Sequence, residues 1–408
     1  MAQSRSRDVW AISLSACFAD LGYQSVLAAF PLFLVVVLRQ SVWEFGVASA
    51  LAYGGGALFS YLGGRLGGKI GHRRLAIIGN ALIPILSLAA LVHSPAAAIG
   101  LLTGGWWARN LRSPSRRVML VEAVPDETAR ARAFGFLHAL DVGGGAAAGL
   151  YVLAAVLAHV EFRWMILGTA FPLLISTLLL SRARTGMIGR RPKTDSPNGT
   201  TVEATGAEQA IPQRHAARRA LLLAAALYGF ASYSTGFPVL TLAEGSHRLA
   251  YGVAAFVVFQ LVSAISGYLL GARLGGDVSF QLAGLGLAGY LTAGLGAVML
   301  AAGYATHAGV LELLSGVAVL GLALGVIETL EPSLMAVFRT GSAAGRGFGA
   351  LSAARSIGVF VANLALGLLY SLGPSWSYAY AALVAGIASG VVLHAVFPAR
   401  LASVRQLG

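Results

Sequence analysis

Charged residues are scarce in this chain, and their scarcity excludes most soluble proteins. Only 11% of the 408 residues are charged, whereas 57% are hydrophobic and a further 52 residues are glycine. A soluble domain is about a quarter charged, because its surface must stay hydrated. The mean hydropathy of +0.75 therefore indicates an integral membrane protein. Its apolar runs are long and unbroken, which favours helices over the short alternating strands of a membrane barrel.

Motifs of enzymes and of ATP-driven pumps are also missing. The sequence has no G-x-x-x-x-G-K-[ST] phosphate loop, so ATP is not expected to be the energy source. No HExxH motif or Cys/His cluster predicts a metal site. The single cysteine, Cys17, excludes an intrachain disulfide. We therefore expect no cofactor, no metal and no enzymatic activity.

Apolar segments long enough to cross a bilayer account for most of the chain. A spanning helix takes about 20 apolar residues. Twelve segments qualify: 9–38, 44–64, 75–93, 96–120, 132–158, 163–181, 219–242, 249–271, 282–304, 308–337, 347–371 and 376–397. The sequence thus predicts an all-α membrane protein with twelve transmembrane helices.

Basic residues are concentrated in alternate gaps between these segments. With the N-terminus inside, 23 of the 29 Lys and Arg residues lie on the inner side, and only Arg39, Arg163 and Arg248 lie in outer gaps. Cytoplasmic loops are enriched in Lys and Arg. Both termini are therefore expected in the cytoplasm and the protein in the cytoplasmic membrane. Since topology explains the net charge of +13, no nucleic-acid partner is expected.

Residues 182–218 interrupt the apolar pattern. They are rich in Arg, Thr, Pro, Gly and Ser and lack apolar periodicity, which predicts a flexible cytoplasmic linker. The linker separates an N-terminal six-helix half, residues 1–181, from a C-terminal six-helix half, residues 219–408.

The two halves share short patterns in the same order. The matches are Ala29-Phe30-Pro31-Leu32 with Gly236-Phe237-Pro238-Val239, Arg65-Leu66-Gly67-Gly68 with Arg273-Leu274-Gly275-Gly276, Pro114 with Pro332, and Phe134-Gly135 with Phe348-Gly349. Such pseudo-symmetric halves predict a site between them near the bilayer midplane, reached alternately from each side.

The loop after the second apolar segment carries a family pattern. It reads Gly64-Arg65-Leu66-Gly67-Gly68-Lys69-Ile70-Gly71-His72-Arg73-Arg74 and resembles the signature loop of major facilitator superfamily transporters, which normally has Asp where this chain has Gly68. Further along, Arg112-Ser113-Pro114-Ser115-Arg116 and Arg130-Ala131-Arg132-Ala133-Phe134-Gly135 resemble a branch of prokaryotic permeases of largely unassigned substrate. The resemblance implies that family's fold, in which the first, fourth, seventh and tenth helices line a central cavity.

Charges inside the apolar segments are the main candidates for function, because a charge at the bilayer centre costs about 2.5 to over 10 kcal/mol. Asp20 and Glu328 are the candidate proton-coupling residues. Asp20 is the favoured proton carrier, since an apolar surrounding disfavours the charged form of a carboxyl group. A hydrogen-bonded packing role is the alternative for Asp20.

Substrate contacts and charge pairs are expected on the same helices. The candidate substrate-binding residues are Arg109, Tyr23, Gln24, Trp106 and Tyr233, with ordinary packing as the alternative for the aromatic ones. Arg112 and Glu331 are expected to pair across the halves, either as a gate or as a purely structural bridge. Asp141 and Arg355, at equivalent positions of the repeat, are expected to form a second salt bridge.

The leading functional hypothesis is a secondary active transporter. It would move a small organic ion or amphipathic solute by alternating access, coupled to protons, with export favoured. The alternatives are proton-coupled uptake of an organic anion with Arg109 and Arg112 as ligands, and a transport-inactive membrane sensor or assembly protein on the same fold. The expected partners are a small-molecule substrate, protons and the lipid bilayer, and the chain is expected to be a monomer.

Overall fold

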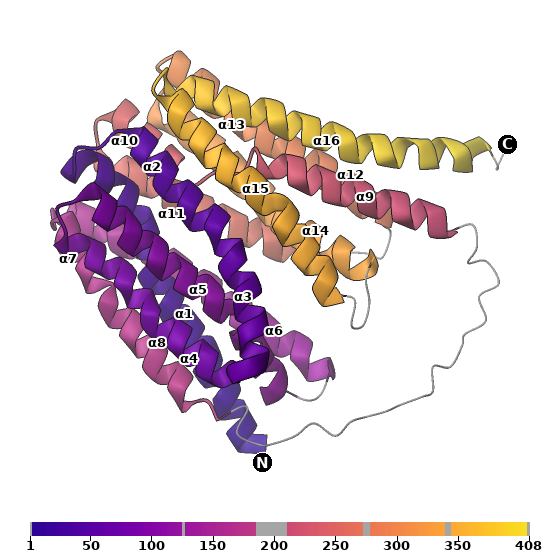
Figure 1. The fold of residues 1–408 in the computed structure, drawn as a ribbon. Helices are drawn as coiled ribbons and strands as arrows, with labels where there is room; N and C mark the ends of the chain where they lie inside the picture. The colour runs from indigo at the N-terminus through magenta and orange to yellow at the C-terminus, as the bar shows by residue number, and fades with distance from the viewer. Residues whose placement is uncertain (1, 125–126, 185–209, 272–277, 339–343, 406–408) are drawn as a thin grey trace.

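The computed structural model describes residues 2–124, 127–184, 210–271, 278–338 and 344–405, and these ranges are almost entirely helical (Figure 1). The N-terminal half contains α1 (Ala2–Leu32), η1 (Phe33–Val37), α2 (Val42–Ser49), η2 (Ala50–Gly54), α3 (Gly55–Ile70), α4 (His72–Leu82), η3 (Ile83–Leu91), α5 (Pro95–Ala123), α6 (Glu127–Leu157), α7 (Phe162–Gly168) and α8 (Ala170–Arg182). The C-terminal half contains α9 (Ala210–Gly229), α10 (Gly236–Ser246), α11 (Leu249–Gly271), α12 (Val278–Gly284), η4 (Leu285–Leu291), α13 (Thr292–Ala305), α14 (Val310–Phe338), α15 (Ala344–Tyr370) and α16 (Pro374–Arg405).

Nine helical segments of the described residues are long and apolar enough to cross a membrane. Three further segments fall short of that criterion. Helix α5 carries four arginines, α9 and α10 are separated by residues 230–235, and the described apolar part of α15 is only Ala354–Tyr370. The all-helical membrane architecture is confirmed, whereas the count of twelve spans remains a prediction.

The segment between the halves is shorter than the sequence predicts. Helix α9 begins at Ala210, so residues 210–218, expected in the linker, are helical. Residues 185–209 lie outside the described part of the chain. The division into two six-helix halves remains a prediction for that reason.

The helices form two bundles that meet at one end and diverge toward the end where the termini lie (Figure 1). At the meeting end α2 and η2 pack against α15, and α1 packs against α10. A Cβ atom on Gly46 would lie 2.7 Å from the carbonyl oxygen of Asn363 and 2.8 Å from the Cα of Gly367, and one on Gly236 would lie 2.2 Å from the ring of Phe45. Only glycine allows this approach. We call this region the closed end and the opposite side the open end.

The second membrane segment changes its partners at a π-helical turn, η2. Before it, α2 packs against α15 of the other half, and after it, α3 packs chiefly against α5 of its own half. The indole N–H of Trp107 donates to the carbonyl oxygen of Leu51 at 2.9 Å, which satisfies a backbone group within the wide turn. The two ends of one segment therefore belong to different packing units.

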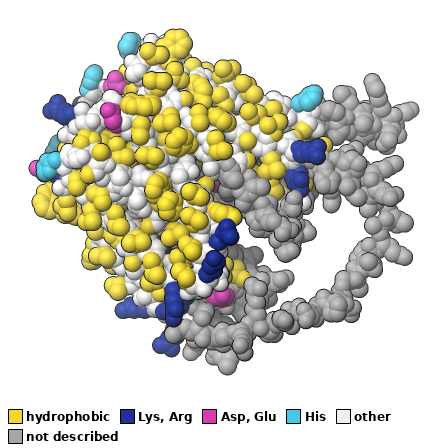
Figure 2. Space-filling model, viewed as in Figure 1, with side chains coloured by type: hydrophobic (Ala, Val, Ile, Leu, Met, Phe, Trp, Pro, Cys, Tyr) yellow, Lys and Arg dark blue, Asp and Glu magenta, His cyan; other side chains and the backbone are white. Residues whose placement is uncertain are grey.

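Hydrophobic side chains cover the flank of the molecule, and Lys and Arg side chains gather toward its ends (Figure 2). Phe171, Tyr268 and Leu311 are 71%, 77% and 81% exposed. Large apolar side chains on so much of the surface are suited to lipid rather than water. The chain is therefore a multi-pass membrane protein.

The signature loop joins α3 to α4 through Gly71, whose φ of +95° suits glycine. Arg73 donates hydrogen bonds to the carbonyl oxygens of Ser181 at 2.6 Å and Ala183 at 2.7 Å, which satisfies the C-terminal end of α8. The Arg65 guanidinium lies 5.7 Å from the centre of the Tyr61 ring. The other predicted loop residues, Gly64, Gly68, Lys69 and Arg74, are exposed. In this conformation the loop therefore braces the N-terminal half.

Candidate functional site

Two cavities lie between the halves, and both include residues from each half. The first, which we call the aromatic compartment, has a volume of about 240 Å³. Its larger side chains are Tyr53, Trp106, Tyr228, Tyr233, Phe256 and Phe259. The second, the charged compartment, has a volume of about 340 Å³ and is lined among others by Asp20, Tyr23, Arg109, His138, Asp141 and Glu328. Gln24 and Gln260 line both compartments, so they mark the junction between them.

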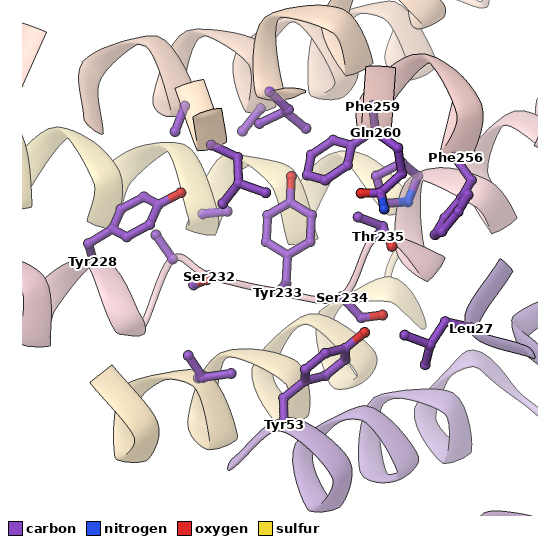
Figure 3. A pocket seen from close by; sticks show the side chains of 18 of the residues that line it. Leu27, Tyr53, Tyr228, Ser232, Tyr233, Ser234, Thr235, Phe256, Phe259 and Gln260 are labelled. Carbon is purple, nitrogen blue, oxygen red and sulfur yellow. The ribbon is translucent and has the colours of Figure 1, made fainter. Parts of the chain in front are cut away.

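A break in the seventh membrane segment shapes the aromatic compartment. The sequence predicts one span over 219–242, but residues 230–235 are not helical and separate α9 from α10. Tyr233 and its neighbours on this stretch line the compartment (Figure 3). The Ser234 N–H donates to the side-chain oxygen of Asn363 at 3.0 Å. Pro238 lies in the first turn of α10, where its missing N–H costs no helical hydrogen bond.

Trp106 connects the two compartments. Its ring packs edge-on against Tyr23, with centroids 5.6 Å apart, and against Tyr53, at 5.1 Å. The adjacent Trp107 faces away and stacks on Phe59 at 4.5 Å. The helical period thus assigns only the first of the two tryptophans to the cavity.

Arg109 lies at the wall of the charged compartment between two aromatic rings. Its guanidinium carbon is 5.2 Å from the centroid of Tyr23 and 5.0 Å from that of Trp106. Its Nη2 donates a long hydrogen bond of 3.4 Å to the Tyr23 hydroxyl, and its Nε is buried without a partner. Among the described residues, no carboxylate lies within salt-bridge distance of Arg109.

Two carboxyl groups meet at the inner surface of the N-terminal half. Asp20 is 4% exposed, and its carboxyl group lies beside that of Asp141, which lines the same compartment. Arg116 forms a salt bridge of 3.2 Å to Asp141. Gly144 allows α6 to approach α1, since a Cβ there would lie 2.3 Å from the carbonyl oxygen of Cys17. Two carboxyl groups in contact favour sharing one proton, because adjacent like charges repel.

The expected charge pairs between the halves are not those of the structure. Arg112 is completely buried and donates to the side-chain oxygen of Asn80, within the N-terminal half. Glu331 instead accepts from Arg355 at 3.1 Å and from the Tyr290 hydroxyl at 2.7 Å. The Arg112–Glu331 pairing is therefore wrong for this conformation. Sequence position gives the depth of a residue in a span but not the direction of its side chain.

The second expected pair is replaced in the same way. Asp141 binds Arg116, whereas Arg355 lies between Glu328, at 3.2 Å, and Glu331. Asp141 and Arg355 do not bind each other, because each forms its salt bridge inside its own half. The two halves are thus free of ion pairs to each other among these charged residues.

The family match covers most of the chain. The model of the Major Facilitator Superfamily matches residues 12–293. The chain belongs to the Major Facilitator Superfamily. A comparison with curated proteins found no match.

Solved structures share the fold over nearly the whole length. A D-xylose-proton symporter is 14% identical, with 94% of this chain and 97% of that chain covered and a TM-score of 0.73. A POT family transporter in complex with a thioalcohol-conjugated peptide is 13% identical, with 95% and 94% covered and a TM-score of 0.72. The xylose transporter XylE from E. coli, in an inward-open conformation, is 15% identical, with 94% and 95% covered and a TM-score of 0.68. At these identities the likeness concerns the fold alone.

Eight of the predicted site residues line the two compartments, but the sequence did not indicate most of the other lining residues: the eight are Asp20, Tyr23, Gln24, Trp106, Arg109, Asp141, Tyr233 and Glu328. Gln260, Tyr53 and Arg116 were not among the predicted site residues. Gln260 had a usable signal, because it is a polar residue deep in the apolar segment 249–271. Arg116 lies within the predicted segment 96–120 and within α5, but its position near the inner end of the segment gave no sign that it pairs with Asp141.

Proposed function

We propose that this chain is a proton-coupled secondary transporter that moves a small organic ion or amphipathic solute by alternating access. The supporting observation is a cavity between two halves that pack closely at the closed end, and this cavity is lined by Asp20, Arg109 and Glu328 among others. Alternating access requires such a site together with halves that can separate. The proposal includes a monomeric transporter in the cytoplasmic membrane with both termini in the cytoplasm.

The carboxyl pair supports coupling to protons. When the pair of Asp20 and Asp141 loses its proton, two carboxylates share one close guanidinium, that of Arg116. This state is disfavoured in a dry cavity and less so when water enters. The proton occupancy of the pair should therefore change as the cavity opens and closes. A ligand at Arg109, on the same wall, would shift that occupancy through its charge.

The direction of transport is proposed from the same elements. We propose export. A proton from outside reaches the carboxyl pair and passes to the cytoplasm, and the substrate binds from the cytoplasm and is released outside. Uptake of an organic anion together with protons is the alternative that the same residues would serve.

Transport in proteoliposomes tests this function. A thermal-shift panel of organic ions identifies a stabilising solute, because ligands that bind the folded protein raise its stability. Vesicles loaded with that solute should release it when a pH gradient is imposed, and release should stop when an uncoupler collapses the gradient. Accumulation driven by the opposite gradient arrangement would support uptake instead. Movement that is indifferent to the gradient in either direction would refute proton coupling.

A further inference from the structure

We propose that the solute is an amphipathic organic anion, with its carboxylate at Arg109 and a ring-sized apolar body in the aromatic compartment. The inference rests on the proposed function, because it names the substrate class of the same site. Four observations carry it: the charge balance of the cavity, the setting of Arg109, the lining of the aromatic compartment, and the junction between the compartments.

The charge balance leaves a cation without a partner. Of the acids that line the charged compartment, Asp141 is paired with Arg116 and Glu328 with Arg355. Asp20 is buried beside Asp141 at the same cavity, and two adjacent carboxyl groups favour sharing one proton. Arg109 has no such carboxylate among the described residues. A ligand carboxylate is the missing counter-charge, whereas an ammonium group would have to displace Arg355 from Glu328.

The setting of Arg109 prepares it for a carboxylate. The rings of Tyr23 and Trp106 hold the guanidinium by cation–π contact, which fixes the direction of its fork. A guanidinium binds a carboxylate through two parallel N–H donors. The Nε of Arg109 is one buried donor that lacks an acceptor. The side chain is therefore positioned before the ligand arrives.

Trp106 lines the aromatic compartment and contacts Tyr23 of the charged compartment. Trp106 contacts Tyr23 on one side and Tyr53 on the other, so an anion at Arg109 has its body directed along this tryptophan. Beyond it, Phe256 and Phe259 supply apolar surface (Figure 3). A cavity of about 240 Å³ accepts a ring-bearing group, and burial of that group favours binding because it removes apolar surface from water.

The junction between the compartments carries two amides, one from each half. Gln24 and Gln260 line both cavities, on either side of Gly145, whose Cβ would lie 3.3 Å from Nε2 of Gln260 and 3.9 Å from Cγ of Gln24. No hydrogen bond between Gln24 or Gln260 and the rest of the described chain is found. A polar atom next to the carboxylate would bridge these amides. The ligand would then hold both halves at once.

A ligand series with one constant body tests the inference by isothermal titration calorimetry, with no gradient present. The probes are 3-phenylpropionate, 3-phenylpropionamide, 3-phenylpropylamine, phenylalanine and propionate. We expect 3-phenylpropionate to bind at least tenfold more tightly than the amide and the amine, because only it pairs with Arg109. Propionate should bind at least tenfold more weakly than 3-phenylpropionate, because it lacks the ring.

Variants locate the binding energy. Arg109→Gln should weaken binding of 3-phenylpropionate at least tenfold and leave the amide within twofold. Arg248→Gln removes an exposed guanidinium at the closed end and should change neither affinity. Trp106→Leu should weaken binding of both the carboxylate and the amide, and that of the carboxylate more, because Trp106 lines the aromatic compartment and also holds Arg109. A single symmetric peak in size-exclusion chromatography establishes that each variant is folded.

Three results would overturn the inference: equal affinity for carboxylate and amide, tighter binding of the amine, or tenfold tighter binding of phenylalanine than of 3-phenylpropionate. Tighter binding of phenylalanine would indicate that Glu328 binds the ammonium group of the ligand. If another solute moves under the gradient and 3-phenylpropionate does not bind, the proposal of an organic anion is refuted and the proposal of proton-coupled transport stands. Binding as expected in a protein that moves no solute under a gradient would keep the site and discard transport.

Discussion

Asp20 is buried, touches a second carboxyl group and still faces the cavity through which a solute would pass. Replacement by asparagine keeps its shape and hydrogen-bonding capacity but removes the proton. We expect Asp20→Asn to reduce gradient-driven transport at least tenfold while substrate binding and downhill exchange persist. Proteoliposome flux and solute counterflow measure the two properties separately.

The control for Asp20 is Asp8→Asn, an acid at the start of α1 that accepts from the backbone N–H of Arg184. It should leave coupled transport unchanged. If Asp20→Asn still drives solute against its gradient in a proton-dependent way, Asp20 is not the carrier. Glu328, which is exposed to the same compartment, would then be the next candidate.

Glu331 is an acceptor buried inside the C-terminal half. Glu331→Ala would leave the Tyr290 hydroxyl without its acceptor and Arg355 with only Glu328. An unsatisfied buried donor costs about 1–3 kcal/mol, so we expect a lower midpoint of thermal unfolding in detergent. Glu331→Gln should be milder, because its carbonyl oxygen can still accept from Tyr290. Glu312→Ala, an exposed acid on α14, serves as the control.

The same network also decides a charge-swap experiment. Because Arg112 binds Asn80 and Glu331 binds Arg355, the double variant Arg112→Glu with Glu331→Arg should unfold at a lower temperature than either single variant. A swap that restores the unfolding midpoint or the transport of the parent protein would show that the two residues meet in another conformation.

The residue types of the site were readable from the sequence, but their partners were not. In-span charges are rare and expensive, which made Asp20, Arg109 and Glu328 conspicuous. The rotation of each helix about its own axis, however, depends on packing between helices, which cannot be read from the sequence. Asn80 accepts a hydrogen bond from Arg112, and Tyr290 donates one to Glu331. In the sequence both look like ordinary residues of apolar segments.

At the scale of helices, the closed end depends on the absence of side chains. Gly46 of α2 and Gly367 of α15 touch through their backbones. Gly367→Leu should keep α2 and α15 apart and favour the conformation open at this end. A cysteine replacing Tyr53 in the aromatic compartment, in a Cys17→Ser background, should then react faster with a maleimide supplied from the closed end.

The matched control is Gly386→Leu on α16, where an added Cβ meets nothing within 4 Å. It should leave the labelling rate of the Tyr53→Cys protein unchanged. An unchanged rate in Gly367→Leu as well would mean that this contact does not hold the halves together.

The positions of the helices were predictable from apolar length, which follows bilayer thickness, but several helices extend six to nine residues beyond the apolar segments, as α9 does from Ala210. The interruptions were not predictable. The non-helical stretch 230–235 and the π-helical turns η1, η2 and η4 lie within apolar sequence, and composition does not distinguish them from continuous helix. The turns η2 and η4 each pack against more than one other helix. Such contacts exist only in the assembled bundle, so the sequence of one segment does not indicate them.

For the whole molecule, the basic residues predict the orientation in the membrane. Thr306, an exposed residue between α13 and α14, and Lys69, at the end of α3, are predicted to lie on opposite sides of the membrane. In intact cells with Cys17 replaced by serine, a membrane-impermeant maleimide should label the protein with Thr306→Cys and spare that with Lys69→Cys. The reverse labelling would invert the topology and with it the proposed direction of export.

The second membrane segment connects two packing units, because its helices on either side of η2 pack against different halves of the molecule. Its α2 part packs against α15 and its α3 part against α5, so any rocking of the halves would twist the turn at η2. Each residue of a regular helix adds about 100° of rotation. Winding the π-helical turn into α-helix would therefore drive a screw motion between the two parts. The hydrogen bond from Trp107 to the carbonyl oxygen of Leu51 lies at this turn and would have to rearrange if the turn were wound into α-helix.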